Sequence, residues 1–149
     1  MGKNVKFLEK KLVALDVTVK DPEEAIKKAG ELLVQADLVE NTYVEAMLRS
    51  YRENGPYFVI APHIAIPHAR PEDGVCEACV SLIQLKHGIH FGHQANDPVK
   101  LVFGLGASSS EEHLTLLKKL MNLLNKQENI KKLFHAKSYE DINQLIKEV

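Results

Sequence analysis

The sequence is short of the features that mark several large classes of protein. Its 149 residues carry a formal net charge of −1, so there is no basic field of the kind that attracts nucleic acid or an anionic membrane surface. No apolar run approaches the roughly 20 residues of a membrane span, and the N-terminus lacks the apolar core of a signal peptide. We therefore expect a cytoplasmic protein that binds no nucleic acid and does not insert into the membrane.

Cysteine is also scarce, since Cys76 and Cys79 are the only two. If residues 75–85 form a strand, a spacing of three residues places the two thiols on opposite faces of the sheet. In that arrangement they neither bridge readily nor share a metal ion. The pair therefore predicts neither a disulfide nor a metal site, and we expect no metal and no other cofactor.

The chain is long enough to bury a proper core, and its 45% of apolar and 26% of charged residues are ordinary for a globular protein. We see no repeat, low-complexity segment or linker, so residues 1–149 are expected to form one domain. Helical patterns at both ends of the chain enclose apolar strands in its middle. We expect a single three-layer α/β domain, with a central mixed β-sheet flanked by helices on both sides.

The expected elements follow from apolar spacing and from capping residues. Helices are predicted over residues 3–12, 22–36, 127–135 and 139–146. Another helix begins at Asn41 or Thr42 and ends near Asn54, and a further one follows the serines at 108–110 and includes Leu124. Strands are predicted over residues 17–19, 57–61, 64–66, 75–85 and 100–105, with a polar excursion over 86–98. Two overlapping Ser-x-x-Glu capping boxes precede the fourth helix. Its buried stripe is predicted to be Leu114, Leu117, Leu120, Met121 and Leu124.

The run from Ile64 to Ala69 is the most informative stretch of the chain. Its first three residues look like the end of a buried strand, and Pro67 then fixes φ and removes a backbone donor. The hydrogen-bond ladder of the strand cannot continue through His68, so this imidazole is expected at the end of the strand with one side facing solvent. His113 lies near the start of a Leu-rich helix, where the two imidazoles can converge. Taken alone, His68 has an alternative structural role, as a strand-end histidine bonded to a loop carbonyl.

Three further histidines, His87, His90 and His93, recur at every third position and raise the alternative of a metal-dependent hydrolase. They flank Gly88 and Gly92 in an expected loop and have no acidic or Cys partner in register, so we expect them to face solvent. His63 follows Pro62 and either edges the His68 site or serves packing.

The segment Gly104-Leu105-Gly106 has the position of a dinucleotide-binding turn, after a strand and before a helix. The third glycine position of that motif is Ser109, and no acidic residue follows at a strand end, so the match is poor. We expect these glycines instead to allow a tight turn from strand to helix.

The segment Glu53–Ala69 resembles the signature of the mannitol/fructose-type enzyme IIA domains of the bacterial sugar phosphotransferase system. The match comprises an acidic residue, six positions, Ile60-Ala61, two positions, and then the run that contains His68. The ascorbate-specific branch is the most similar, through the segments Gly55–Val59, Ala61-Pro62, Pro67-His68, Arg70–Glu72 and Asn96–Val99. The resemblance extends over essentially the whole chain, including the order of helices and strands.

The resemblance implies a phosphotransferase that accepts a phosphoryl group from phospho-HPr on His68. It further implies transfer of that group to a cysteine of enzyme IIB, for uptake of ascorbate through a membrane enzyme IIC. His113 would be the second active-site histidine and Arg52 the arginine that contacts the phosphate. Relative to the family pattern, this chain has two extra residues between Met47 and His68. Arg49 is therefore an alternative to Arg52 for the phosphate contact, and Arg70 is a third candidate. The alternative is a regulatory enzyme IIA-like domain whose phosphorylation controls a partner protein.

Phosphoryl transfer explains why these residue types are needed. A neutral imidazole is a competent nucleophile toward phosphorus near pH 7, and the spread negative charge of the transition state must be compensated. With no metal motif, protein groups must do this. His113 lies in the first turn of its helix, where free backbone N–H groups favour an anion and disfavour protonated imidazole. Glu111 and Glu112 oppose an anion there unless they point away.

Overall fold

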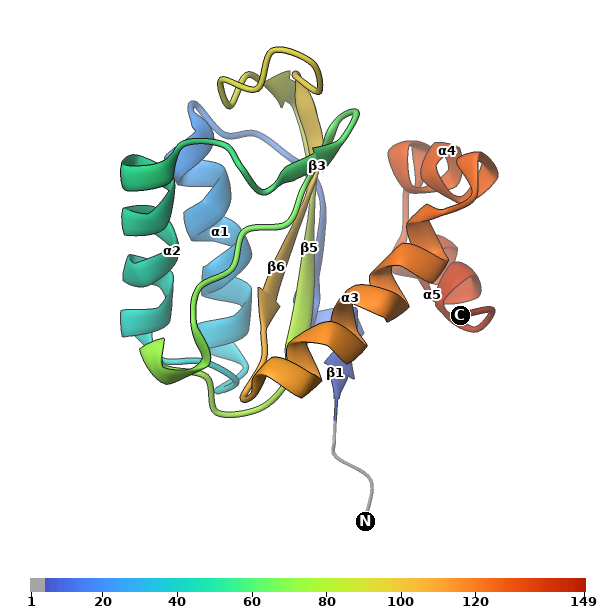
Figure 1. The fold of residues 1–149 in the computed structure, drawn as a ribbon. Helices are drawn as coiled ribbons and strands as arrows, with labels where there is room; N and C mark the ends of the chain where they lie inside the picture. The colour runs from blue at the N-terminus through green and yellow to red at the C-terminus, as the bar shows by residue number, and fades with distance from the viewer. Residues whose placement is uncertain (1–4) are drawn as a thin grey trace.

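The computed structural model describes residues 5–149, which fold into a mixed β-sheet with helices packed on both faces (Figure 1). Within this range the strands are β1 (Lys6–Phe7), β2 (Val13–Val17), β3 (Val59–Ala61), β4 (Ile64–Ala65), β5 (Cys79–Ile89) and β6 (Val99–Gly106). The helices are α1 (Pro22–Gln35), α2 (Asn41–Asn54), α3 (Ser110–Leu124), α4 (Gln127–His135) and α5 (Tyr139–Ile146). The expected three-layer α/β architecture is confirmed. No helix in the part described has both the length and the apolar character needed to cross a membrane.

The sheet runs in the order β1-β5-β6-β4-β3, and β2 also pairs with β5. The pairs β1–β5, β2–β5 and β4–β6 are parallel, whereas β5–β6 and β3–β4 are antiparallel. Helices α1 and α2 cover one face and α3, α4 and α5 cover the other, so the sheet lies between two hydrophobic cores (Figure 1). Strand β5 serves both cores, because Ile83 packs into the first and Leu82 into the second. Burial on both faces accounts for its nearly continuous apolar sequence.

Local capping chemistry sets the ends of α1 and α2 as expected. The Asp21 carboxylate accepts a hydrogen bond from the Glu24 N–H at 2.8 Å, and Pro22 occupies the first helical position. Helix α2 ends at Asn54, and Gly55 follows with φ of +76°, a backbone conformation that only glycine adopts readily. Because these signals are local, the sequence alone predicts both helices to within a residue.

Gly104 lies inside β6 and does not form the tight turn expected of it. A Cβ atom at this position would lie 2.7 Å from Ser81 Oγ and 3.3 Å from Ala29 Cβ of α1. Ser81 Oγ donates a hydrogen bond of 2.8 Å to the Ala29 carbonyl. The glycine therefore allows α1 to approach the sheet closely, and the expectation of a glycine turn is wrong.

The N-terminal expectations are also wrong. Residues 3 and 4 of the expected helix lie outside the described residues, but Lys6–Phe7 form β1 and Lys10–Leu12 form a short 3-10 helix, η1. The first long strand covers 13–17, so 17–19 is only its edge. Both β1 and β2 pair with β5, which is distant in sequence, and this pairing overrides the helical spacing of residues 3–12. Leu8 and Leu12 are buried in the resulting structure.

The buried face of α3 also differs from the expected stripe. Its buried residues are Glu112, Leu116, Leu120, Leu123 and Leu124. Leu114 and Met121 are instead 54% and 39% exposed. Leucines occur all around this helix, so apolar spacing alone does not select the face that packs on the sheet.

Candidate active site

Sheet topology brings His68 and His113 to one edge of the sheet. Strands β4 and β6 are parallel, so their carboxyl ends meet at the same edge. His68 follows β4 by three residues, and α3, which carries His113 in its first turns, begins four residues after β6. The centroids of the two imidazole rings are 5.0 Å apart, with an angle of 54° between the ring planes. The convergence expected from the sequence is therefore present.

The His68 ring is held in one tautomer by the backbone just after β4. Its Nδ1 lies 2.8 Å from the Ile66 carbonyl oxygen, which can only accept, so Nδ1 carries the proton. In the neutral ring the lone pair is then on Nε2. The side chain is half-buried. The Tyr57 ring contacts the His68 imidazole edge to face, with 6.0 Å between the ring centroids. His68 thus presents a fixed nucleophilic nitrogen.

A buried tyrosine of α2 fixes the backbone next to His68. The Tyr43 hydroxyl donates to the Leu105 carbonyl at 2.6 Å and accepts from the Ala69 N–H at 3.0 Å. Its side chain is fully buried, and burial raises its pKa, so the hydroxyl stays protonated. The hydroxyl therefore joins α2, β6 and the segment that carries His68.

At the N-terminus of α3, hydrogen bonds engage the Glu112 carboxylate in the helix cap. Ser109 Oγ accepts from the Glu112 N–H, and the Glu112 carboxylate accepts from the Ser108 N–H at 2.6 Å and from its hydroxyl at 2.5 Å. Glu112 is buried in this cap, whereas Glu111 is exposed. The pKa of His113 is lowered, first by burial and then by the neighbouring His68. Near pH 7 His113 is therefore a neutral donor at a helix N-terminus.

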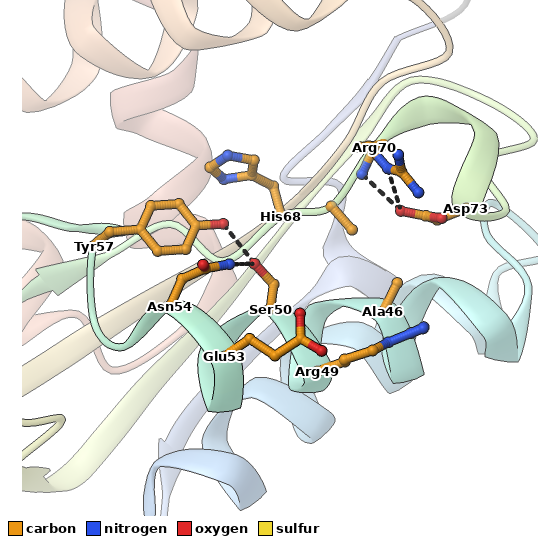
Figure 2. A pocket seen from close by; sticks show the side chains of 10 residues that line it. Ala46, Arg49, Ser50, Glu53, Asn54, Tyr57, His68, Arg70 and Asp73 are labelled. Atoms are coloured by element: carbon orange, nitrogen blue, oxygen red, sulfur yellow. Dashed lines mark hydrogen bonds and ion pairs between the residues drawn. The ribbon is translucent and has the colours of Figure 1, made fainter.

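His68 lines a cavity of about 440 Å³ (Figure 2). One wall is the C-terminal half of α2, which contributes residues at helical spacing, and the other is the segment after His68. The lining residues are Ala46, Arg49, Ser50, Glu53, Asn54, Tyr57, His68, Ala69, Arg70 and Asp73. The cavity is larger than a phosphoryl group needs, which leaves room for a side chain of a donor or acceptor protein.

The structure does not place Arg52 at this cavity. Its guanidinium binds the Glu23 carboxylate of α1 at 2.6 Å and 3.2 Å, on the side of α2 away from His68. Arg49, one turn earlier on α2, does line the cavity and forms no ion pair within residues 5–149. Arg70 lines it too, but lies 3.6 Å from the Asp73 carboxylate (Figure 2). Of the three arginines left open by the sequence, Arg49 is the one in the cavity without a carboxylate partner among the described residues.

The remaining histidines do not join the site. His63 Nδ1 donates to the Pro98 carbonyl at 2.7 Å, so this ring has a packing role. His87 and His90 are exposed, and His93 Nδ1 accepts from the Asn96 N–H. Across residues 5–149, no three His, Cys, Asp or Glu side chains are grouped so as to hold a metal ion.

Both cysteine thiols are free. Cys76 is exposed and precedes β5, which begins only at Cys79, so the expected start of the strand at residue 75 is four residues too early. Burial raises the pKa of Cys79 to about 12, and its thiol stays neutral.

Three residues that sequence reasoning did not assign to the site border His68 in the structure: Tyr43, Ser50 and Tyr57. Tyr43 appeared only as part of an apolar stripe, and Ser50 carried no signal. Tyr57 belongs to the Gly55–Val59 segment that resembles the ascorbate branch, and this is the one signal that pointed to it.

The chain is similar to known proteins over most of its length. Residues 6–149 match the family model "Phosphoenolpyruvate-dependent sugar phosphotransferase system, EIIA 2". The ascorbate-specific PTS system EIIA component of Escherichia coli K12 is 37% identical over 139 residues, which is 93% of this chain and 90% of that protein.

Solved structures show the same fold. The mannitol-specific cryptic phosphotransferase enzyme IIA CmtB of Escherichia coli superimposes with a TM-score of 0.85 and 31% identity, covering 96% of each chain. The mannitol enzyme IIA of Escherichia coli, solved in complex with phosphorylated enzyme IIB, has a TM-score of 0.85 and 32% identity. That match covers 96% of this chain and 99% of the other.

Proposed function

Since this chain belongs to the EIIA 2 family of the phosphoenolpyruvate-dependent sugar phosphotransferase system, we propose that His68 accepts a phosphoryl group from phospho-HPr and passes it to a cysteine of enzyme IIB. The observation that carries the proposal is the hydrogen bond from His68 Nδ1 to the Ile66 carbonyl, which leaves the Nε2 lone pair for attack on phosphorus. Residues 1–149 act in this proposal as one EIIA domain.

The transfer consists of two in-line displacements. In the first, the Nε2 lone pair forms an N–P bond as the bond from phosphorus to the donor imidazole of HPr breaks. The donor ring, protonated on its other nitrogen, leaves as neutral imidazole with the electron pair, and His68 keeps its Nδ1 proton. In the second, a thiolate of enzyme IIB attacks the same phosphorus, and the N–P electron pair returns to His68 Nε2. No net oxidation occurs, and the protein ends each cycle unchanged.

Charge compensation comes from groups on both sides of the imidazole. Neutral His113, at the N-terminus of α3, donates one ring N–H to a phosphoryl oxygen. Arg49 supplies a guanidinium that can bind two oxygens at once and that no carboxylate of residues 5–149 already occupies. This replaces Arg52 in the role expected from the sequence, because Arg52 is engaged with Glu23.

The relatives support the proposed sugar and the proposed acceptor protein. The identity to an ascorbate-specific EIIA component supports ascorbate uptake through a membrane enzyme IIC, to which this protein is linked without inserting into the membrane. The neighbour solved with phosphorylated enzyme IIB supports an enzyme IIB as acceptor. Exposed Tyr57 and Leu114, beside His68 and His113 respectively, give HPr and enzyme IIB an apolar surface on which to dock.

The test is incubation with enzyme I, HPr and phosphoenolpyruvate, followed by mass spectrometry of the intact protein. We expect the mass gain of one phosphoryl group, lost in His68→Ala and retained in His87→Ala, an exposed histidine away from the cavity. Label on another residue, or none on the wild type, overturns the proposal.

Adding a cognate enzyme IIB to the labelled protein tests the second half of the cycle. A carrier discharges rapidly onto the IIB cysteine. Label that stays on His68 in the presence of enzyme IIB would instead identify a regulatory IIA-like domain.

A further inference from the structure

Two hydroxyl groups in the His68 cavity are bonded to each other. Ser50 Oγ and Tyr57 Oη are 2.9 Å apart, and the Asn54 side-chain amide donates to the same Ser50 oxygen at 3.4 Å (Figure 2). Ser50 belongs to the wall of the cavity formed by α2, and Tyr57 to the segment between α2 and β3. The charge compensation described above uses neither hydroxyl.

A count of protons shows that the pair holds one unused donor. Two hydroxyls carry two protons, and the bond between them uses one. Either hydroxyl can donate across this bond. Because the phenol is the stronger acid and the better donor, we infer the arrangement in which Tyr57 donates to Ser50. Ser50 Oγ also accepts from the Asn54 amide, which fills both of its lone pairs. The Ser50 proton is therefore left to donate to something else in the cavity.

Packing holds this pair in place although Tyr57 is 48% exposed. Its ring contacts the Phe58 ring edge to face, with centroids 5.4 Å apart and planes at 74°. It also meets the His68 imidazole edge to face at 6.0 Å and 79°. Tyr57 thus touches the nucleophile with its ring and Ser50 with its hydroxyl.

We propose that the Ser50 hydroxyl donates a hydrogen bond to an oxygen of the phosphoryl group on His68, and that Tyr57 is the positioning residue that orients it. The inference rests on the proposed phosphorylation of His68. A phosphoryl group presents three terminal oxygens, whereas His113 and Arg49 approach from two elements only. Ser50 adds a neutral donor to a cavity that is also lined by the carboxylates of Glu53 and Asp73, which repel an anion.

The variants Ser50→Ala, Ser50→Thr and Tyr57→Phe separate these roles. Alanine favours helix, so Ser50→Ala is expected to keep α2 folded. We expect Ser50→Ala to slow phosphorylation by phospho-HPr about tenfold or more, as for the loss of a hydrogen bond to a charged group. Ser50→Thr, which keeps the hydroxyl, restores most of the rate. Tyr57→Phe, which keeps the ring contacts, gives a smaller loss.

The matched control is Tyr51→Phe. This hydroxyl lies on the same helix and donates to the Phe91 carbonyl at 2.7 Å, outside the cavity. We expect its removal to leave the phosphorylation rate unchanged.

A second readout is the ³¹P chemical shift of the phosphohistidine, which a purely structural role of Ser50 would not move. We expect a change in Ser50→Ala and a wild-type value in Ser50→Thr and Tyr51→Phe. A wild-type rate and an unchanged ³¹P shift in Ser50→Ala overturn the inference while His68 labelling stands. Absence of label on the wild type would instead overturn the proposed function itself.

Discussion

The two imidazoles of the site are 5.0 Å apart, yet their surroundings give them different parts. His68 is oriented by the Ile66 carbonyl and offers a lone pair, whereas His113 lies in the first turns of α3. Burial and the nearby His68 lower the pKa of His113. A neutral His113 avoids the repulsion that two protonated rings would impose on each other before phosphate arrives.

This shift makes stability depend on pH in a defined direction. The pKa of His113 is lower in the folded protein than its ordinary value near 6.5, so below that pH the unfolded chain binds the extra proton first. Stability is therefore lost as pH falls from about 6.5 toward the folded pKa. We expect His113→Gln to lose less stability than the wild type between about pH 7 and pH 5, as measured by urea unfolding.

The control for this measurement is His87→Gln, because His87 is exposed. Its unfolding free energy should follow the wild type across the same range. Parallel curves for His113→Gln and the wild type would contradict a lowered His113 pKa.

At the scale of helices and strands, local chemistry was readable from the sequence and long-range packing was not. The Asp21 cap and the Gly55 end of α2 are set by neighbours in the chain, and both helices were predicted closely. Strand β1 was missed because it forms only by pairing with β5, more than seventy residues away. The buried face of α3 was misassigned because leucines surround that helix.

The site follows the same division. The Ile64–Ala69 run predicted His68, and the expected helix start predicted His113 beside it. The arginine could not be chosen, because the side of α2 that faces His68 depends on how α2 packs. Glu23 of α1 binds Arg52 from the opposite side, and only the folded chain shows this.

The approach of α1 to the sheet gives a test at this scale. Gly104→Ala would place a Cβ atom 2.7 Å from Ser81 Oγ, so the helix or the hydroxyl must move. We expect a loss of about 1–3 kcal/mol in the free energy of unfolding, typical of overpacking, measured by urea denaturation.

The double variant Gly104→Ala/Ser81→Ala is the check on this mechanism. Removing Ser81 Oγ removes the nearest contact of the new methyl group, so the double variant should be more stable than the sum of the two single losses predicts. Strict additivity would show that the clash with Ser81 is not the cause.

For the molecule as a whole, the proposed active site lies at one end of the sheet, away from the C-terminal helices that help to stabilise the fold. The groups that we propose to react gather where β4 and β6 end, whereas α4 and α5 pack in the second core after the C-terminal end of α3 (Figure 1). Gln84 of β5 is paired with Leu101 of β6. The site end of β6 is marked by Leu105, whose N–H donates to the Pro67 carbonyl, and Leu105 lies four residues from Leu101. That separation is about 13 Å along the strand.

Gln84 joins three distant parts of the chain through one buried side chain. Its Oε1 accepts from the Asp16 N–H at 3.0 Å, and its Nε2 donates to the Leu133 and Ala136 carbonyls at 2.9 Å each. The residue is 7% exposed, so water cannot readily replace these bonds.

Replacing Gln84 by Leu keeps the volume but leaves the three backbone groups without their partner. We expect a loss of roughly 3 kcal/mol in the free energy of unfolding, measured by urea denaturation. Gln144→Leu is the matched control, because Gln144 is exposed and bonds only the Glu140 side chain, so its stability should change little. Phosphorylation of His68 in folded Gln84→Leu should proceed at the wild-type rate, since the change leaves the edge of the sheet untouched. A slowed phosphorylation in that variant would mean that the C-terminal helices act on the site through the sheet.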